Sequence, residues 1–434
     1  MANRGQNYAR KSLYKWTSYD IILLKISVNI NKNGGQKIMS DAKKYLTSHP
    51  WIKFQLDLSQ DIPFRLWILL GAAESKCRHL AGIPLRPEKQ NELNKVSLRK
   101  GAQATTAIEG NSLSEEEIGK IMDNKDERLP LSKEYQRIEV LNVIGAYNAI
   151  IDSVNRLGTC GAGYEELLSD NRAILSGLEL GSGLVPGEIR THSVGVGNYR
   201  GAPAEDCEYL LKTLFRWIGS DWELGSDHKT IEGILKAIVA HLYITWIHPF
   251  GDGNGRSARM LEFRLLMASG VPMTAAHLLT THYNVTRAEY YRALASTSQN
   301  SGGNPVAFIL YALQGFVDAL DEQIKTILAE QLRVTWENYV HYEEFNGTLS
   351  DAQARQRDLL LELSKFTSPV TLNELKRRLS SELLAKYDKK TIRAFNRDIN
   401  DLERRNLIVK TAKGISAATG RMRAFLPVCK QSEF

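Results

Sequence analysis

One segment of 12 residues, 248–259, constrains the fold of this chain more than any other. Its sequence is His-Pro-Phe-Gly-Asp-Gly-Asn-Gly-Arg-Ser-Ala-Arg. Apolar residues recur at helical spacing before it, over 231–246, and after it, over 257–267. We therefore expect two helices joined by a short glycine-rich turn, with the polar groups of the turn held between them.

The turn contains the groups that bind a phosphate. Gly253, Asn254 and Gly255 tolerate positive φ, so their consecutive amides can converge on an anion. The next helix, expected to begin at about residue 256, adds free amides and partial positive charge at its N-terminus. Arg256 and Arg259 lie one turn apart on that helix, and both are expected to face the anion.

Two further side chains of the segment suit a reaction at that anion. Asp252 supplies a carboxylate for Mg²⁺, while phosphate oxygens and water complete the octahedron. Because histidine titrates near neutrality, His248 can take a proton from an attacking hydroxyl. A calcium loop starting at Asp252 does not fit, since its sixth and twelfth positions are Ser257 and Phe263 instead of Gly and Glu. The sequence also lacks a Walker-type phosphate loop.

The segment resembles the motif of the Fic family, H-x-F-x-[DE]-G-N-G-R-x-x-R, at every fixed position, with Asp252 in place of the commoner Glu. The resemblance implies a mainly α-helical core that transfers AMP from ATP to a Ser, Thr or Tyr hydroxyl of a target protein. In that case His248 is the general base, Asp252 the Mg²⁺ ligand and Phe250 a buried anchor. The glycines of 253–255 would cradle phosphate oxygens, and the two arginines would hold the β/γ end of the nucleotide.

Upstream, a helix predicted over 91–109 ends in Thr-Thr-Ala-Ile-Glu-Gly, with Gly110 as a left-handed cap. Electrostatics alone favour a solvated Glu109, because its carboxylate lies at the negative end of the helix dipole. The hexapeptide, however, resembles the inhibitory motif [ST]-x-x-x-E-[GN] of Fic proteins. The resemblance implies that Glu109 pairs with Arg259 and excludes the productive position of the ATP γ-phosphate. An Arg–carboxylate pair is geometrically suited to that competition.

Residues 187–198 alternate β-branched residues with small and polar ones, which predicts a short β-hairpin. An ordinary surface hairpin would show the same pattern. The Fic resemblance implies that this hairpin is a flap that aligns the target segment by strand addition. We therefore expect the following residues beside the nucleotide: Val194, Gly195, Val196 and Gly197.

A helix predicted over 284–295 carries Tyr290 and Tyr291. Adjacent residues on a helix face different directions, so at most one of the two is expected to fill the core. Tyrosine offers an apolar face for adenine together with a hydroxyl, and the Fic resemblance implies that the pair lines the adenine pocket. Ordinary packing of both rings is the alternative.

After residue 347 the sequence predicts helices over 354–366, 371–386 and 389–406, followed by strand-like residues over 407–427. This is the order of a winged helix-turn-helix. Basic residues recur along the third helix and can form a stripe facing phosphates: Lys389, Lys390, Arg393 and Arg397. Acidic residues interrupt the same helix: Asp398, Asp401 and Glu403. DNA binding and protein contact both remain open for this domain.

Charge is unevenly placed along the 434 residues, whose net charge is +7. Residues 1–38 hold seven Lys/Arg and one acidic residue, and 351–434 hold 18 Lys/Arg and 10 Asp/Glu. The body between them is therefore net acidic, which confines any nucleic-acid argument to the C-terminal end. We predict four parts: a basic extension that is disordered or artefactual (1–38), an N-terminal helical region with the inhibitory helix (39–130), the Fic catalytic domain (131–346) and a winged-helix-like domain (347–434).

Hydrophobic residues at 43% and charged residues at 24% are typical of a globular protein. Four scattered cysteines predict free thiols in a reducing compartment, hence a cytoplasmic protein, and the apolar run at 21–30 is too short to cross a membrane. Expected ligands are ATP and Mg²⁺. The expected partner is a target protein. DNA binding by the C-terminal domain and pairing with a second copy of the chain stay open. Two alternatives are a DNA-binding regulator that senses nucleotide, and an enzyme that removes AMP from a modified protein.

Overall fold

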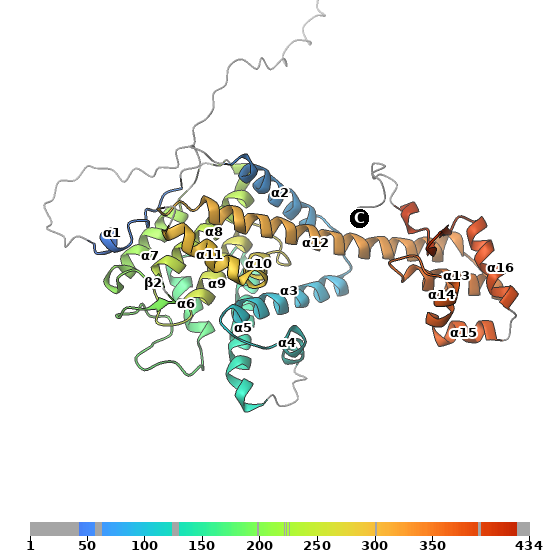
Figure 1. Ribbon diagram of the computed structural model, residues 1–434, viewed down its shortest axis with the longest axis horizontal. Helices are drawn as coiled ribbons and strands as arrows, with labels where there is room; N and C mark the ends of the chain where they lie inside the picture. The colour runs from blue at the N-terminus through green and yellow to red at the C-terminus, as the bar shows by residue number, and fades with distance from the viewer. Residues whose placement is uncertain are drawn as a thin grey trace, which may run out of the picture. The chain divides into compact units, whose positions relative to one another are not determined.

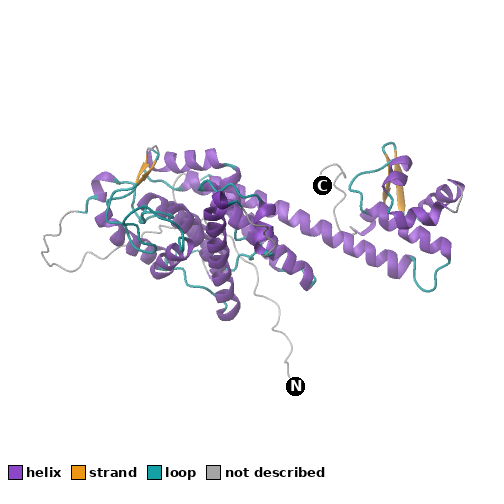
Figure 2. Ribbon diagram, turned by 90° about the horizontal axis from the view of Figure 1, so that it is seen from below, coloured by secondary structure: helices purple, strands orange, loops and turns teal. Residues whose placement is uncertain are grey.

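The computed structural model describes residues 43–422, apart from gaps at 57–62, 124–129, 198, 221, 223, 225, 300–301 and 389–391. The basic extension predicted at 1–38 lies outside the described residues. The chain divides into two compact units, Met1–Leu320 and Asp321–Phe434. Helices dominate both units, and the described strands form two small hairpins (Figures 1 and 2).

The first unit contains the segment at 248–259. Its helices, in chain order, are α1 (Tyr45–Ser48), α2 (Phe64–Ala81), α3 (Pro87–Ile108), α4 (Glu115–Met122), η1 (Leu131–Lys133), α5 (Glu134–Leu157), α6 (Tyr164–Ile174), α7 (Ala204–Ile218), η2 (Ser226–His228), α8 (Lys229–Ile247), α9 (Asn254–Ala268), α10 (Leu278–Val285) and α11 (Arg287–Gln299), and α12 (Val306–Tyr339) begins in it. A hairpin of β1 (Gly195–Val196) and β2 (Tyr199–Arg200) lies between α6 and α7.

Helices α8 and α9 pack against each other at the centre of this unit. By length and composition α8 could cross a membrane, yet most of it is buried among neighbouring helices, as in the core helix of a globular domain. The turn between the two helices begins at His248 and ends at Gly253, which adopt φ values of 53° and 75°. The predicted pair of helices joined by a glycine-rich turn is therefore present.

Helix α3 packs against α5, α9 and α10, which brings its C-terminal end to the turn. Its N-terminus is Pro87, four residues before the predicted start, because proline is well suited to the first helical position. A capping box at Ser114 opens α4. The hairpin lies closer to the C-terminus than predicted, because its turn forms around Gly197, whose φ is 56°.

The second unit contains the end of α12, then η3 (Val340–Glu344), α13 (Asp351–Ser364), α14 (Leu372–Arg378), α15 (Ser381–Asp388), α16 (Ile392–Arg404), β3 (Ile408–Thr411), β4 (Gly414–Ala417) and η4 (Thr419–Met422). The helix predicted over 371–386 is in fact two helices, because Leu379 is extended at φ −64° and ψ 146°. Strand β4 ends at Ala417 and η4 follows it, whereas residues 423–427 of the predicted strand-like region lie outside the described residues.

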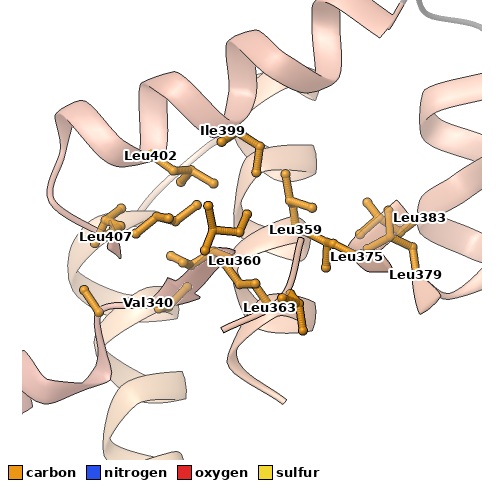
Figure 3. Close-up of a cluster of buried hydrophobic side chains, with 14 of the residues drawn as sticks. Val340, Leu359, Leu360, Leu363, Leu375, Leu379, Leu383, Ile399, Leu402 and Leu407 are labelled. Atoms are coloured by element: carbon orange, nitrogen blue, oxygen red, sulfur yellow. The ribbon is translucent and has the colours of Figure 1, made fainter. Parts of the chain in front are cut away.

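A cluster of buried apolar side chains holds the second unit together (Figure 3). Leu359, Leu360 and Leu363 of α13 meet Ile399 and Leu402 of α16 within it. Val370 pairs with Ile415 as an isolated bridge beside the β3–β4 hairpin. The order of helices followed by a hairpin suits a winged helix-turn-helix, an assignment that remains a prediction.

Candidate functional site

A cavity of about 690 Å³ lies in the first unit beside the turn between α8 and α9. This volume is in the range of sites for small ligands. Its walls come from the end of α3, the β1–β2 hairpin, the α8–α9 turn and α11. The sequence-predicted residues that line it are Glu109, Val194, Gly195, Val196, Gly197, His248, Asp252, Gly253, Asn254, Gly255, Arg259, Tyr290 and Tyr291.

His248 ends α8 in a left-handed conformation, which turns its imidazole toward the cavity. Its Nδ1 lies 3.4 Å from the Thr245 carbonyl oxygen. Burial lowers the pKa of His248, and the positive charge of Arg190 lowers it further, against a raising contribution from the Thr245 carbonyl. The imidazole is thus held neutral at neutral pH, and with Nδ1 protonated toward Thr245, Nε2 is the basic nitrogen.

The anion site is the N-terminus of α9 and does not take the form of a three-residue nest. Gly253 has positive φ, but Asn254 and Gly255 are already helical, so the helix begins two residues before the predicted position. The Asn254 side chain accepts a hydrogen bond from the Phe250 amide and donates one to the Phe250 carbonyl, both at 2.8 Å. Asn254 therefore braces the turn around Phe250, which is buried, and the first amides of α9 remain to bind an anion.

The two arginines of the segment diverge, contrary to the expectation that both face the anion. Arg256 directs Nη1 to Glu139 Oε1 at 2.7 Å and Nη2 to Asp252 Oδ1 at 3.0 Å. Arg256 does not line the cavity, because its guanidinium is paired with the buried carboxylate of Glu139 on α5. Arg259 is 1% exposed and lines the cavity.

Arg259 contacts two residues at the end of α3. Its Nε donates to Thr105 Oγ1 at 2.8 Å, and its Nη2 donates to the Thr105 carbonyl at 3.0 Å. The same Nη2 lies 2.5 Å from Glu109 Oε1. Thr105 therefore orients the guanidinium, and Glu109 neutralises it.

Glu109 lies over the first turn of α9. A Cβ placed on Gly255 would be 2.3 Å from Glu109 Oε1, so the carboxylate packs closely on the helix N-terminus. Burial raises the pKa of Glu109, but Arg259, together with Arg256 and His248, outweighs this effect and the net pKa is lowered. The side chain keeps 33% exposure and lines the cavity. A charged carboxylate thus occupies the place where the helix would bind another anion.

Asp252 lines the cavity with a side chain that is 40% exposed. The two hydrogen bonds that the described residues donate to it, from its neighbour Gly253 and from Arg256, both end on Oδ1. No group of three or more His, Cys, Asp or Glu side chains suited to a metal occurs among the described residues. A single, partly exposed carboxylate such as that of Asp252 fits Mg²⁺, which proteins often bind through one carboxylate while phosphates and water supply the other ligands.

The hairpin is fixed beside His248 by Arg190. Its guanidinium donates to the carbonyls of His248 at 2.7 Å, of His192 at 2.6 Å and of Ala202 at 2.5 Å. A Cβ on Gly201 would lie 2.7 Å from the His248 Cβ, so the chain after the hairpin passes directly against the histidine. The edge at Gly195 and Val196 faces the cavity and is exposed.

Tyr290 and Tyr291, both on α11, form another wall of the cavity. Tyr290 is 2% exposed, and its hydroxyl lies 2.9 Å from Nε2 of the buried His241. Tyr291 is 42% exposed. Both line the cavity, so Tyr290 belongs to the core and to the wall at once, whereas Tyr291 offers the more open ring.

Several residues that shape the site could not be identified from the sequence. Glu139, Arg190 and Asn171 are distant in sequence from the turn, and Asn171 Nδ2 donates to the Asp252 carbonyl at 3.1 Å. No local pattern marks them, because their partners are set by helix packing. Thr105 begins the hexapeptide that contains Glu109, so its position in that motif was the one available signal.

Comparison with known proteins finds similar sequences and a similar fold. The model of the Fic/DOC family matches residues 164–266. Protein adenylyltransferase fic-1 of Caenorhabditis elegans is 30% identical over 190 residues, which cover 44% of this chain and 34% of that protein. Protein adenylyltransferase Fic of Drosophila melanogaster is 36% identical over 86 residues, covering 20% of this chain and 16% of that protein. The chain thus spans about a third or less of the length of these curated relatives.

A solved structure shows the same fold. The crystal structure of a Fic family protein from Desulfovibrio desulfuricans G20 is similar with a TM-score of 0.50 and 20% identity, over 81% of this chain and 92% of that one. At this identity the similarity concerns the fold alone. Residues 164–266, which the family model matches, contain the complete motif at 248–259, so this part of the chain is similar to the Fic/DOC domain.

Proposed function

We propose that this chain is a protein adenylyltransferase that transfers AMP from ATP to a Ser, Thr or Tyr hydroxyl of a target protein, and that Glu109 restrains it. The observation that carries the proposal is the contact of Glu109 with Arg259 over the N-terminus of α9, in the cavity that His248 and Asp252 also line. The names of the curated relatives support the reaction class.

The transfer begins with a proton. Neutral His248 accepts the proton of the target hydroxyl, and the hydroxyl oxygen attacks the α-phosphorus of ATP. An oxygen–phosphorus bond forms, the bond from the α-phosphorus to the bridging oxygen breaks, and pyrophosphate leaves. The amides at the start of α9 offset negative charge on the phosphates. Asp252 would hold Mg²⁺, which supplies further charge neutralisation there.

The hairpin is suited to bind the target segment, and the tyrosines are suited to bind the adenine of ATP. The exposed edge at Gly195 and Val196 suits main-chain pairing with an extended target segment, a mode that tolerates different sequences. Arg190 ties this edge to His248, so a paired segment would be placed next to the base. The ring of Tyr291 offers an apolar surface for adenine.

Glu109 restrains the reaction because one arginine serves two anions. Glu109 contacts Nη2 of Arg259 and also covers the first turn of α9. ATP therefore has to displace a charged carboxylate to place its terminal phosphates there. Thr105 would continue to orient Arg259 after Glu109 leaves, since its two hydrogen bonds do not involve the carboxylate.

The proposal is tested with the full-length Glu109→Gly variant, Mg²⁺ and a cell lysate, using α-labelled and γ-labelled ATP in parallel. We expect the variant to add label from the α-phosphate to protein, and to add no label from the γ-phosphate beyond that of the lysate alone. Adding His248→Ala should reduce labelling about 10²–10⁴-fold, the usual contribution of a general base. His79→Ala is the matched control, because His79 is exposed on α2. Full labelling by the His248→Ala variant would refute the mechanism.

A further inference from the structure

Helix α16 of the second unit has two sharply different faces. One face is buried: Phe395, Asp398, Ile399 and Leu402 are at most 2% exposed. The other face is exposed and follows helical spacing of three and four residues: Arg393, Asn396, Arg397, Asn400 and Arg404. We call these five residues the Arg/Asn stripe. All five side chains are arginine or asparagine.

The acidic residues that interrupt this helix in the sequence lie off the stripe. Asp398 is fully buried and accepts hydrogen bonds from Arg355 Nε at 2.7 Å and Tyr387 Oη at 2.9 Å. It is therefore part of the core of the unit, where its charge is paired. Asp398 therefore adds no negative charge to the exposed face of α16, which carries the Arg/Asn stripe.

The other two acids flank the stripe and are neutralised. Asp401 pairs with Arg404 and accepts a hydrogen bond from Gln356 at 3.2 Å. Glu403 pairs with Lys410 of β3, and the same Nζ lies 3.2 Å from Asn400 Oδ1. Lys410 thus adds a cation from the hairpin at the edge of the stripe.

Two arginines in the N-terminal half of the stripe have no partner among the described residues. The guanidinium groups of Arg393 and Arg397 make no hydrogen bond or ion pair with any residue that the structure describes. Two free guanidinium groups four residues apart lie on the same helix face. They are held in place by a helix whose opposite side is anchored in the apolar cluster of Figure 3 through Ile399 and Leu402.

We propose that the Arg/Asn stripe binds duplex DNA, with α16 lying in the major groove. Arginine forms paired hydrogen bonds with the edge of guanine, and asparagine forms them with adenine, so this composition suits the reading of base edges. An α-helix fits the width of the major groove. The excess of basic residues over acidic ones at 351–434, 18 against 10, suits a polyanion.

The composition of the stripe disfavours a protein partner. The centres of protein interfaces are rich in aromatic and other apolar residues. Among the α16 side chains that the structure describes, those of residues 393–404, no large apolar one is exposed. A surface of arginine and asparagine without an apolar centre matches the groove of a nucleic acid better than the surface of a protein.

The test uses the full-length chain and a pool of random-sequence duplex DNA, with binding measured by fluorescence anisotropy over a series of salt concentrations. The Arg393→Ala/Arg397→Ala variant should bind about ten- to a hundredfold more weakly. The matched control is Lys325→Ala/Arg333→Ala, which removes the same charge from exposed positions on α12. Its binding should remain close to that of the parent.

A second variant separates recognition from charge. Arg393→Lys/Arg397→Lys keeps both charges but removes the planar fork, so salt-dependent binding should persist while enrichment of particular sequences from the pool is lost. Circular dichroism of each variant reports whether α16 still folds. Equal weakening in the control variant would overturn the proposal. So would unchanged DNA binding by the alanine pair, or equally effective competition by single-stranded RNA.

Discussion

Replacing Glu109 by glycine is expected to raise the rate of AMP transfer at low ATP concentration. The parent carboxylate lies 2.5 Å from Arg259 Nη2, a hydrogen bond between charged groups. Such bonds contribute about 1.5–3 kcal/mol, which corresponds to about ten- to 150-fold in rate or affinity. Because Glu109 keeps 33% exposure, solvent screening places the expected effect near the lower limit, at about tenfold.

The assay measures initial rates over a series of ATP concentrations for the parent and three variants. Glu109→Gly removes the side chain, and Glu109→Gln keeps its shape but removes its charge. Glu116→Ala, at an exposed position on α4, is the matched control. We expect the apparent KM for ATP to fall in the order parent, glutamine variant, glycine variant, with the control equal to the parent.

Thermal unfolding gives an independent measure of the same competition. Without Glu109, Arg259 is a buried charge whose remaining hydrogen bonds among the described residues go to Thr105, so the melting temperature of the free variant should fall. ATP should then raise that temperature more in the Glu109→Gly variant than in the parent, because tighter binding stabilises more at one ligand concentration. An unchanged KM together with an equal thermal shift by ATP would refute the assignment of Glu109 as a restraint.

Three further predictions concern neighbouring groups. In the Glu109→Gly background, Thr105→Val removes the hydroxyl that orients Arg259 and should raise the KM for ATP about tenfold. Thr106→Val should leave the KM unchanged, because the Thr106 hydroxyl donates to a carbonyl within α3. Because burial lowers the pKa of His248 from 6.5, the rate should rise with pH through a midpoint below 6.5, measured as kcat/KM against pH. Glu139→Ala breaks the buried ion pair with Arg256 and should lower the free energy of unfolding, measured by urea denaturation, by about 3–5 kcal/mol. The control Glu134→Ala breaks an exposed pair with Arg137 and should lower it by about 1 kcal/mol or less.

The sequence was informative wherever a short segment carried its own geometry. Residues 248–259 specified two helices and a turn because glycine and apolar spacing act locally, and both helices formed. Gly110 likewise marked the end of α3. Pairs of groups in one such segment were less predictable. Helical spacing placed Arg256 beside Arg259, but the distant carboxylate of Glu139 holds Arg256 away from the cavity.

The remaining differences have the same physical origin, since contacts between distant segments decided them. The hairpin lies at 195–200, where Arg190 binds carbonyls on either side of it, and no local signal marks that arginine. The predicted helix over 371–386 breaks at Leu379, a residue that is buried in the apolar cluster. The acids of α16 could not be separated into buried and exposed ones until Asp398 was seen beside Arg355.

The central claim is that AMP moves from ATP to a protein hydroxyl once Glu109 is removed. Mass spectrometry of a lysate treated with the Glu109→Gly variant, ATP and Mg²⁺ tests it most directly, with the Glu109→Gly/His248→Ala variant as the control. The account predicts peptides that carry one added AMP on a Ser, Thr or Tyr side chain in the first sample and not in the second. Peptides that gain phosphate without adenosine in the first sample but not in the second, or a loss of AMP from proteins already modified, would contradict it.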